Sequence, residues 1–82
     1  MITMTSTLLR TERLYGNRPA IIDAEVHYTW KQHIARVRKL AGGLTKLGVA
    51  KGDRFGIIGP NSFRYTELIH AGYWAGAIPV PI

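Results

Sequence analysis

The sequence contains no cysteine, and only five of its 82 residues are acidic. The absence of cysteine excludes disulfide bonds and thiolate metal sites, which is compatible with a reducing compartment. No apolar run approaches the roughly 20 residues that a membrane-spanning helix needs. Residues 1–7 have neither the basic start nor the apolar stretch of a secretory signal. We therefore expect a cytoplasmic protein without a membrane span.

Because acidic residues are few, the 11 lysines and arginines leave a net charge of +6. Basic residues gathered on one face are typical of a nucleic-acid-binding protein. Here the cations are distributed over nearly every predicted element, and the densest group falls on one predicted helix. A solvated helix face explains that group better, so we expect no nucleic-acid partner. A small basic binding or interaction module, of the kind that contacts nucleic acid, is the alternative function.

The last third of the chain predicts a strand, a helix and a second strand. Residues 54–59 and 78–82 are short apolar runs bounded by turn residues, and a helical pattern lies between them. This order is that of a βαβ unit with parallel strands. Strands so apolar need cover on both faces, which the other 50 or so residues cannot supply. We therefore expect an α/β fold in which residues 1–82 are the incomplete opening part of a larger domain, without a second domain.

The first third predicts a short helix followed by a β-hairpin. Residues 6–15 have helical spacing and end at Gly16, and the apolar contacts of this helix are expected to be Leu8, Leu9 and Leu14. Residues 19–23 and 26–28 are predicted strands. The turn between them lacks the glycine that a two-residue hairpin favours, so its geometry stays open.

A capping box predicts where the longest helix begins. Thr29 and Gln32 have the spacing at which each side chain accepts a hydrogen bond from the other residue's backbone. The helix that follows is expected to end at Gly48. Its apolar stripe recurs at steps of three and four residues, namely Trp30, Ile34, Val37, Ala41 and Leu44, broadened by Leu40 and Leu47. Gly42 and Gly43 each cost about 1 kcal/mol relative to alanine, which predicts close packing of this helix on a sheet.

The helix of the βαβ unit is expected to begin after Pro60, with Asn61 or Ser62 as its N-cap. Its predicted buried face consists of Tyr65, Leu68, Ile69 and Gly72. Proline has no backbone N–H group, and Pro79 and Pro81 are two residues apart in the last strand. Both missing donors therefore fall on the same side of that strand. The regular ladder should therefore run through Ile78, Val80 and Ile82.

The reactive side chains form no recognisable site in the sequence. The histidines His27, His33 and His70 have no partner at i+4 and no flanking carboxylate pair, so a metal site is not expected. Each is expected to be an ordinary surface or half-buried side chain. Asp23 and Glu25 are explained as a solvated turn, and Ser62 as a helix cap rather than a nucleophile. The glycines Gly52, Gly56 and Gly59 match neither common phosphate-binding pattern. We predict no catalytic, cofactor-binding or metal-binding residue within residues 1–82.

Several short motifs follow one another in an order that is typical of one enzyme family: Thr29-Trp30, Arg38-Lys39-Leu40-Ala41 with Leu44, residues 47–54, Asn61-Ser62, and residues 75–82. Together they resemble the start of the adenylate-forming (AMP-binding) enzymes, with the acyl-CoA synthetases as the nearest branch. The most specific part is the "LGV-x-x-GDR" turn combined with the "AGA-x-x-VP" strand. The likeness extends over about residues 14–82. It departs mildly at Trp30, where the family often has tyrosine, and in the 23–25 turn, where it often has glycine.

The resemblance implies the N-terminal scaffold segment of an enzyme that joins a carboxylate to AMP and then transfers the acyl group, usually to coenzyme A. The parent enzyme would use ATP, Mg and coenzyme A on a fatty or aryl acid. The family's phosphate loop, its adenine contacts and its catalytic lysine come later in the chain than residue 82. The segment is therefore expected to bind no cofactor and to be inactive alone. Its partners would be the rest of its own domain or another copy, and a homo-oligomer is left open.

Overall fold

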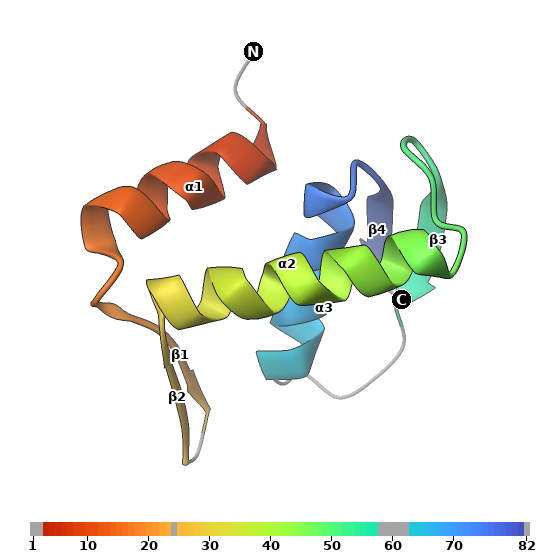
Figure 1. The fold of residues 1–82 in the computed structure, drawn as a ribbon. Coiled ribbons are helices and arrows are strands. Elements are labelled where there is room, and N and C mark those ends of the chain that lie inside the picture. Colours follow the sequence, from red (N-terminus) through yellow and green to blue (C-terminus); the bar gives the residue numbers. More distant parts are fainter. Residues whose placement is uncertain (1–2, 24, 58–62, 82) are drawn as a thin grey trace.

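The computed structural model describes residues 3–23, 25–57 and 63–81. In chain order they form α1 (Met4–Tyr15), β1 (Pro19–Asp23), β2 (Val26–Thr29), α2 (Trp30–Lys46), β3 (Arg54–Ile57), α3 (Phe63–Trp74) and β4 (Ile78–Pro81). Figure 1 shows α2 running across the molecule, with the β1–β2 hairpin at one end of it and the β3–β4 sheet at the other. The fold is α/β, as predicted, and its order of elements is the predicted one.

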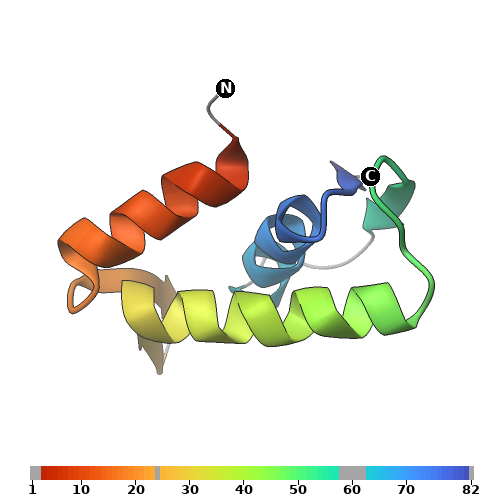
Figure 2. The ribbon, with the colours of Figure 1, turned by 45° about the horizontal axis from the view of Figure 1, so that its top comes forward.

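The first helix begins earlier than predicted because Thr3 caps it. The Thr3 hydroxyl accepts a hydrogen bond from the Ser6 amide, and the Ser6 side chain accepts one from the Thr3 amide, both at 3.0 Å. Leu8 is buried, whereas Leu9 and Leu14 are 40% and 54% exposed. The expectation that all three leucines form packing contacts was therefore wrong for two of them. Figure 2 shows the C-terminal end of α1 approaching the N-terminal end of α2. Glu12 of α1 and Arg38, halfway along α2, form an ion pair at 3.9 Å.

The predicted hairpin is present. Strands β1 and β2 pair antiparallel, with Ile22 opposite His27 and Asp23 opposite Val26. The register shifts between Pro19 and Ile21. The middle of the turn, at residue 24, lies outside the described residues.

The capping box that opens α2 is confirmed. The Thr29 amide donates to Gln32 Oε1 at 2.9 Å, and the Gln32 amide donates to Thr29 Oγ1 at 3.2 Å. The buried residues of the helix are His33, Ile34, Val37, Ala41 and Leu44. Four of them belong to the predicted apolar stripe. Leu47, which was also predicted to belong to it, is 84% exposed, because the helix has ended before this residue. Gly48 then turns the chain with φ +97°, a conformation that favours glycine.

The two glycines inside α2 do not pack against a sheet. A Cβ atom built at Gly42 or at Gly43 would meet nothing within 4 Å, and both residues are exposed. The predicted close approach was therefore wrong at these positions. It occurs instead at Gly72 of α3, where a Cβ atom would lie 2.6 Å from Cζ of Phe55.

The βαβ unit is confirmed by the pairing of β3 with β4. The strands are parallel, with Phe55 opposite Pro79 and Ile57 opposite Pro81. The Ile78 amide donates to the Asp53 carbonyl at 2.7 Å, on the side of the strand that the proline spacing predicts for the ladder. The predicted strand residues 58–59 and 82, and the helix caps expected at Asn61 or Ser62, lie outside the described residues.

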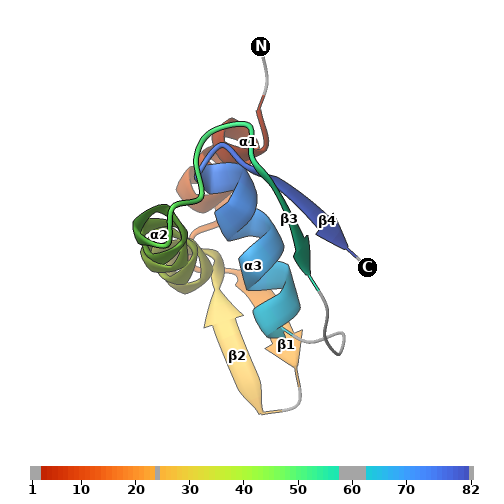
Figure 3. The same ribbon diagram turned by 90° about the vertical axis from the view of Figure 1, so that its right-hand side faces the viewer.

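Helix α3 is the middle layer of the molecule. Figure 3 shows it between α2 on one side and the β3–β4 sheet on the other. The buried core cluster consists of Val37, Ala41, Leu44 and Ala71, and Phe55, Leu68 and Trp74 are among the half-buried side chains packed on it. The predicted contacts Tyr65, Leu68 and Ile69 are half-buried, while Gly72 is buried. One face of the sheet rests on α3, and on the other face Ile78 and Val80 stay 43% and 41% exposed.

Candidate functional site between α2 and α3

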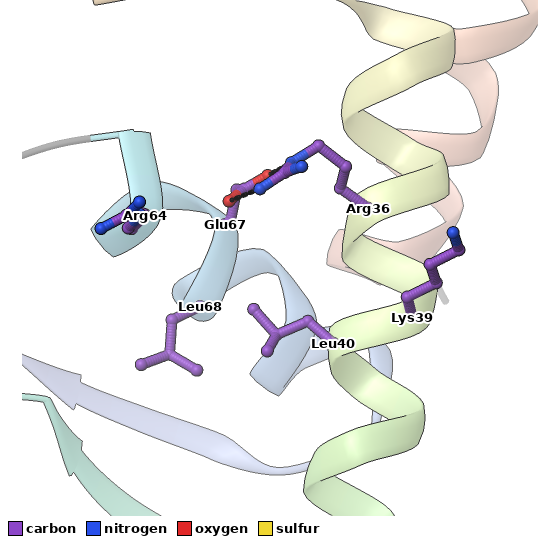
Figure 4. Close-up of a pocket in the computed structure, with 6 residues that line it drawn as sticks. All are labelled: Arg36, Lys39, Leu40, Arg64, Glu67 and Leu68. Carbon is purple, nitrogen blue, oxygen red and sulfur yellow. Dashed lines mark hydrogen bonds and ion pairs between the residues drawn. The ribbon is translucent and has the colours of Figure 1, made fainter. Parts of the chain in front are cut away.

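A hollow among the described residues lies along the seam between α2 and α3 (Figure 4). Its volume is about 570 Å³, and it is lined by Arg36, Lys39, Leu40, Arg64, Glu67 and Leu68. Helical spacing places these side chains, because positions three and four apart share one face of each helix. The hollow is therefore lined by both apolar and charged side chains, which is typical of a ligand-binding site.

An ion pair spans this hollow. Glu67 is only 4% exposed, and its carboxylate accepts hydrogen bonds from Nε and Nη2 of Arg36, the second at 3.2 Å. The guanidinium also lies 4.6 Å from the ring centroid of Tyr28 and 5.9 Å from that of Phe63. The hydrogen bond to Glu67 raises the pKa of Arg36 above its usual value. Through these contacts Arg36 of α2 connects that helix to Glu67 of α3 and to Tyr28 of β2.

The other two cations of the hollow do not converge on a common point. Figure 4 shows Lys39 and Arg64 on either side of the Arg36–Glu67 pair. Arg64 instead lies over the ring of Phe63, 5.4 Å from its centroid. An anion site needs several donors aimed at one position. These residues do not build one.

Two histidines form a second polar contact across the same seam. His33 Nε2 on α2 and His70 Nδ1 on α3 are 2.8 Å apart. His33 is fully buried, and its other ring nitrogen, Nδ1, has no hydrogen-bond partner among the described residues. Burial is the main cause that lowers the pKa of His33 to about 4, and burial also lowers the pKa of His70. The prediction of ordinary surface or half-buried histidines was wrong for His33, because its partner lies far away in the sequence.

Asp23 also has a long-range role that the turn hypothesis missed. Its Oδ2 accepts a hydrogen bond from the Phe63 amide at 3.0 Å and so ties the hairpin to the start of α3. Glu25 and His27 are exposed, as expected for a turn and a hairpin surface. Gly52 turns the chain with φ +86° before β3. Ser62 and Gly59 lie outside the described residues.

The described residues contain no group of three or more histidine, cysteine, aspartate or glutamate side chains that could hold a metal ion. In the same part of the chain, no helix is both long and apolar enough to cross a membrane. The polar side chains that the structure does bring together, across the α2–α3 seam and at Asp23, all join one element to another. Their geometry is that of a scaffold.

Comparison with known proteins gives a consistent result. The family described as AMP-binding enzyme matches residues 8–82. The probable acyl-activating enzyme 22 of Arabidopsis thaliana is 35% identical over 81 residues, which cover 99% of this chain and 15% of that protein. The peroxisomal benzoate–CoA ligase of the same plant is 33% identical over 99% of this chain and 14% of its own length. The chain thus spans about a seventh of these relatives.

Solved structures agree with the sequence relatives. The inhibitor-bound N-terminal domain of FACL13 from Mycobacterium tuberculosis superposes with a TM-score of 0.94 at 31% identity, over 100% of this chain and 21% of that one. The putative long-chain-fatty-acid CoA ligase of Rhodopseudomonas palustris superposes with a TM-score of 0.93 at 34% identity, over 99% of this chain and 21% of that one. The N-terminal subdomain of Klebsiella oxytoca NpsA shares the fold, with a TM-score of 0.96 at 21% identity.

Proposed function

Because the chain belongs to the AMP-binding enzyme family, we propose that it is the N-terminal scaffold segment of a larger ligase that activates a carboxylic acid. The ligase would form an acyl-adenylate from the acid and ATP and transfer the acyl group to coenzyme A. The observation that carries this proposal is the superposition of the whole chain on part of the FACL13 N-terminal domain. Relatives named as acyl-activating enzymes and CoA ligases support the same reaction class.

The division of labour follows from where the polar side chains lie. Adenylate formation needs cations and amide donors placed where phosphate charge develops. In the described residues, Arg36 is bound to Glu67, and Lys39 and Arg64 lie on either side of that pair. ATP, Mg and coenzyme A would therefore be bound by the rest of the enzyme, and residues 1–82 alone would be inactive.

The substrate is proposed to be a fatty or aryl acid. The relatives include a benzoate–CoA ligase and a trans-cinnamate:CoA ligase, and the structural neighbours include a fatty acyl-CoA synthetase. These names describe those proteins and supply the two acid classes to test. The remainder of the domain, or a second copy of the chain, is the proposed protein partner. We place the enzyme in the cytoplasm, which subcellular fractionation would test.

The test is exchange of labelled pyrophosphate into ATP, measured on the protein expressed from its full reading frame with a panel of fatty and aryl acids. We expect exchange that depends on the acid and on Mg, followed by thioester formation when coenzyme A is added. Activity with one of the two acid classes would assign the substrate. Lack of acid-dependent exchange across the panel would contradict the proposed reaction.

The alternative, a small basic module that contacts nucleic acid, predicts a different result. Phosphate contacts release counterions, so true binding would weaken steeply as salt is added. We expect only weak retention on DNA or RNA, without a steep salt dependence.

A further inference from the structure

The contact between His33 and His70 depends on the protonation state of both rings. With the two facing nitrogens 2.8 Å apart, a neutral pair offers one N–H donor and one acceptor. A doubly protonated pair would place two N–H groups against each other. A single added proton puts a charge on a pair whose α2 member is fully buried, where desolvation opposes it. The contact is therefore built for neutral rings.

The charged groups around the pair do not remove this penalty. Arg36 lies one turn after His33 on α2, and Glu67 lies one turn before His70 on α3. The Glu67 carboxylate favours the protonated form of His33, but it is already bound through both oxygens to Arg36. Arg36 and His70 both disfavour that form. Tyr28 of β2, another titratable group, lies against the guanidinium of Arg36.

We propose that His33 and His70 form an acid-sensitive fastening between α2 and α3, which holds the helices together while both rings are neutral and releases them when the pair takes up protons. Release would uncover the core cluster of Val37, Ala41, Leu44 and Ala71, which lies along the same seam. The pair is well placed to matter, because α3 is the layer on which both α2 and the β3–β4 sheet rest.

The direction of the effect follows from the two states of His33. Packed between the helices, its pKa is lowered to about 4, whereas in the opened chain it returns to the ordinary value of 6.5. The opened state therefore binds more protons, and acid favours it. The contribution of the pair to stability is fully present above pH 6.5 and is lost as the pH falls toward 4.

The experiment follows hydrogen exchange of the α2 and α3 amides between pH 7.5 and 4.5 in the protein expressed from its full reading frame, with exchange rates corrected for their intrinsic pH dependence. We expect the opening equilibrium of the seam to rise by roughly ten- to a hundredfold over this range. The double variant His33→Leu/His70→Leu should lose most of that rise. The matched control is His27→Gln, at an exposed histidine of β2 that lies outside the pair, and it should keep the rise.

A second measurement does not depend on how the leucine variant folds. Imidazole nitrogen shifts of the unmodified protein should show His33 neutral at pH 6, with a titration midpoint well below the ordinary value of 6.5. A midpoint for His33 at the ordinary value of 6.5, or the same acid-induced opening in the double variant and the unmodified protein, would overturn the proposal.

Discussion

At Gly72 the packing of the fold depends on the absence of a side chain. A Cβ atom there would lie 2.6 Å and 2.8 Å from Cζ and Cε1 of Phe55, and 3.4 Å from Cβ of Pro79. The Phe55 ring packs on the core cluster, so it can move aside only by leaving that contact. Gly72 lets α3 approach both strands of the β3–β4 sheet.

We expect Gly72→Ala to lower the free energy of unfolding by about 1–3 kcal/mol, because it overpacks this contact. The measurement is urea denaturation of the protein from its full reading frame. Unchanged stability would mean that the Phe55 ring moves aside freely.

Gly43 is the matched control, since a Cβ atom there meets nothing within 4 Å. Gly43→Ala should raise the free energy of unfolding by about 1 kcal/mol, the difference in helix propensity between glycine and alanine. This expectation is the opposite of what the close packing predicted from the sequence would imply for the same position. A loss of stability in the same urea titration would show that something covers this face of α2 after all.

At the scale of elements, α2 and α3 are joined by a buried carboxylate. Glu67 is 4% exposed, whereas the Arg36 side chain is 45% exposed. Removing Arg36 alone would leave the carboxylate buried without its partner, which is costly. We expect Arg36→Met to destabilise by about 1–3 kcal/mol, at the lower end of a buried pair because water still reaches Arg36.

The double variant Arg36→Met/Glu67→Met tests that reason. It removes both charges together, so much of the lost stability should return. A double variant whose loss equals the sum of the two single losses would show that the ion pair contributes no coupling between the helices.

The hairpin is joined to α3 by one hydrogen bond, from the Phe63 amide to Asp23. The carboxylate satisfies an amide of the first turn and lies at the positive end of the helix. Asp23→Ala should therefore cost about 1 kcal/mol and speed hydrogen exchange in the first turn of α3. Glu25→Ala, at an exposed residue of the same hairpin, should change neither quantity.

The sequence could predict features that depend on neighbouring residues, but it could not predict contacts between residues far apart in the chain. The capping box at Thr29 and Gln32, the hairpin and the order of β3, α3 and β4 follow from signals within a few neighbouring residues. The contacts of His33, Glu67 and Asp23 join residues 31 to 40 positions apart. Their partners are decided by how the helices pack, and no local spacing reveals them.

The apolar stripe of α2 was predicted correctly in its centre and wrongly at its end. Periodicity places Leu47 on the stripe, but the helix stops at Lys46 and Leu47 becomes its exposed cap. The two glycines inside α2 led to a wrong prediction of close packing on a sheet for a related reason. A glycine inside a helix signals that something is unusual there, but it does not say whether another layer lies against it.

At the scale of the whole molecule, the described residues cover only one face of the β3–β4 sheet. The side chains of Ile78 and Val80 stay about two-fifths exposed on the other face. Within the described residues, β3 and β4 pair only with each other, so each has one unpaired edge. Apolar strands with open edges and an open face associate with other surfaces. The family relatives, of which this chain spans about a seventh, contain much more chain that could supply such cover.

We therefore expect the isolated 82-residue chain to aggregate, or to become ordered only when the rest of its domain or another copy shields Ile78 and Val80. It should also catalyse no acid-dependent exchange of pyrophosphate into ATP, because its clustered polar groups are used to join its own elements. Light-scattering mass, a thermal melt and the exchange assay should be run side by side on the short chain and on the protein from its full reading frame. A cooperative melt from a dilute monomer of the short chain would contradict the incomplete core. Exchange activity in the short chain would show that the catalytic groups lie within these residues.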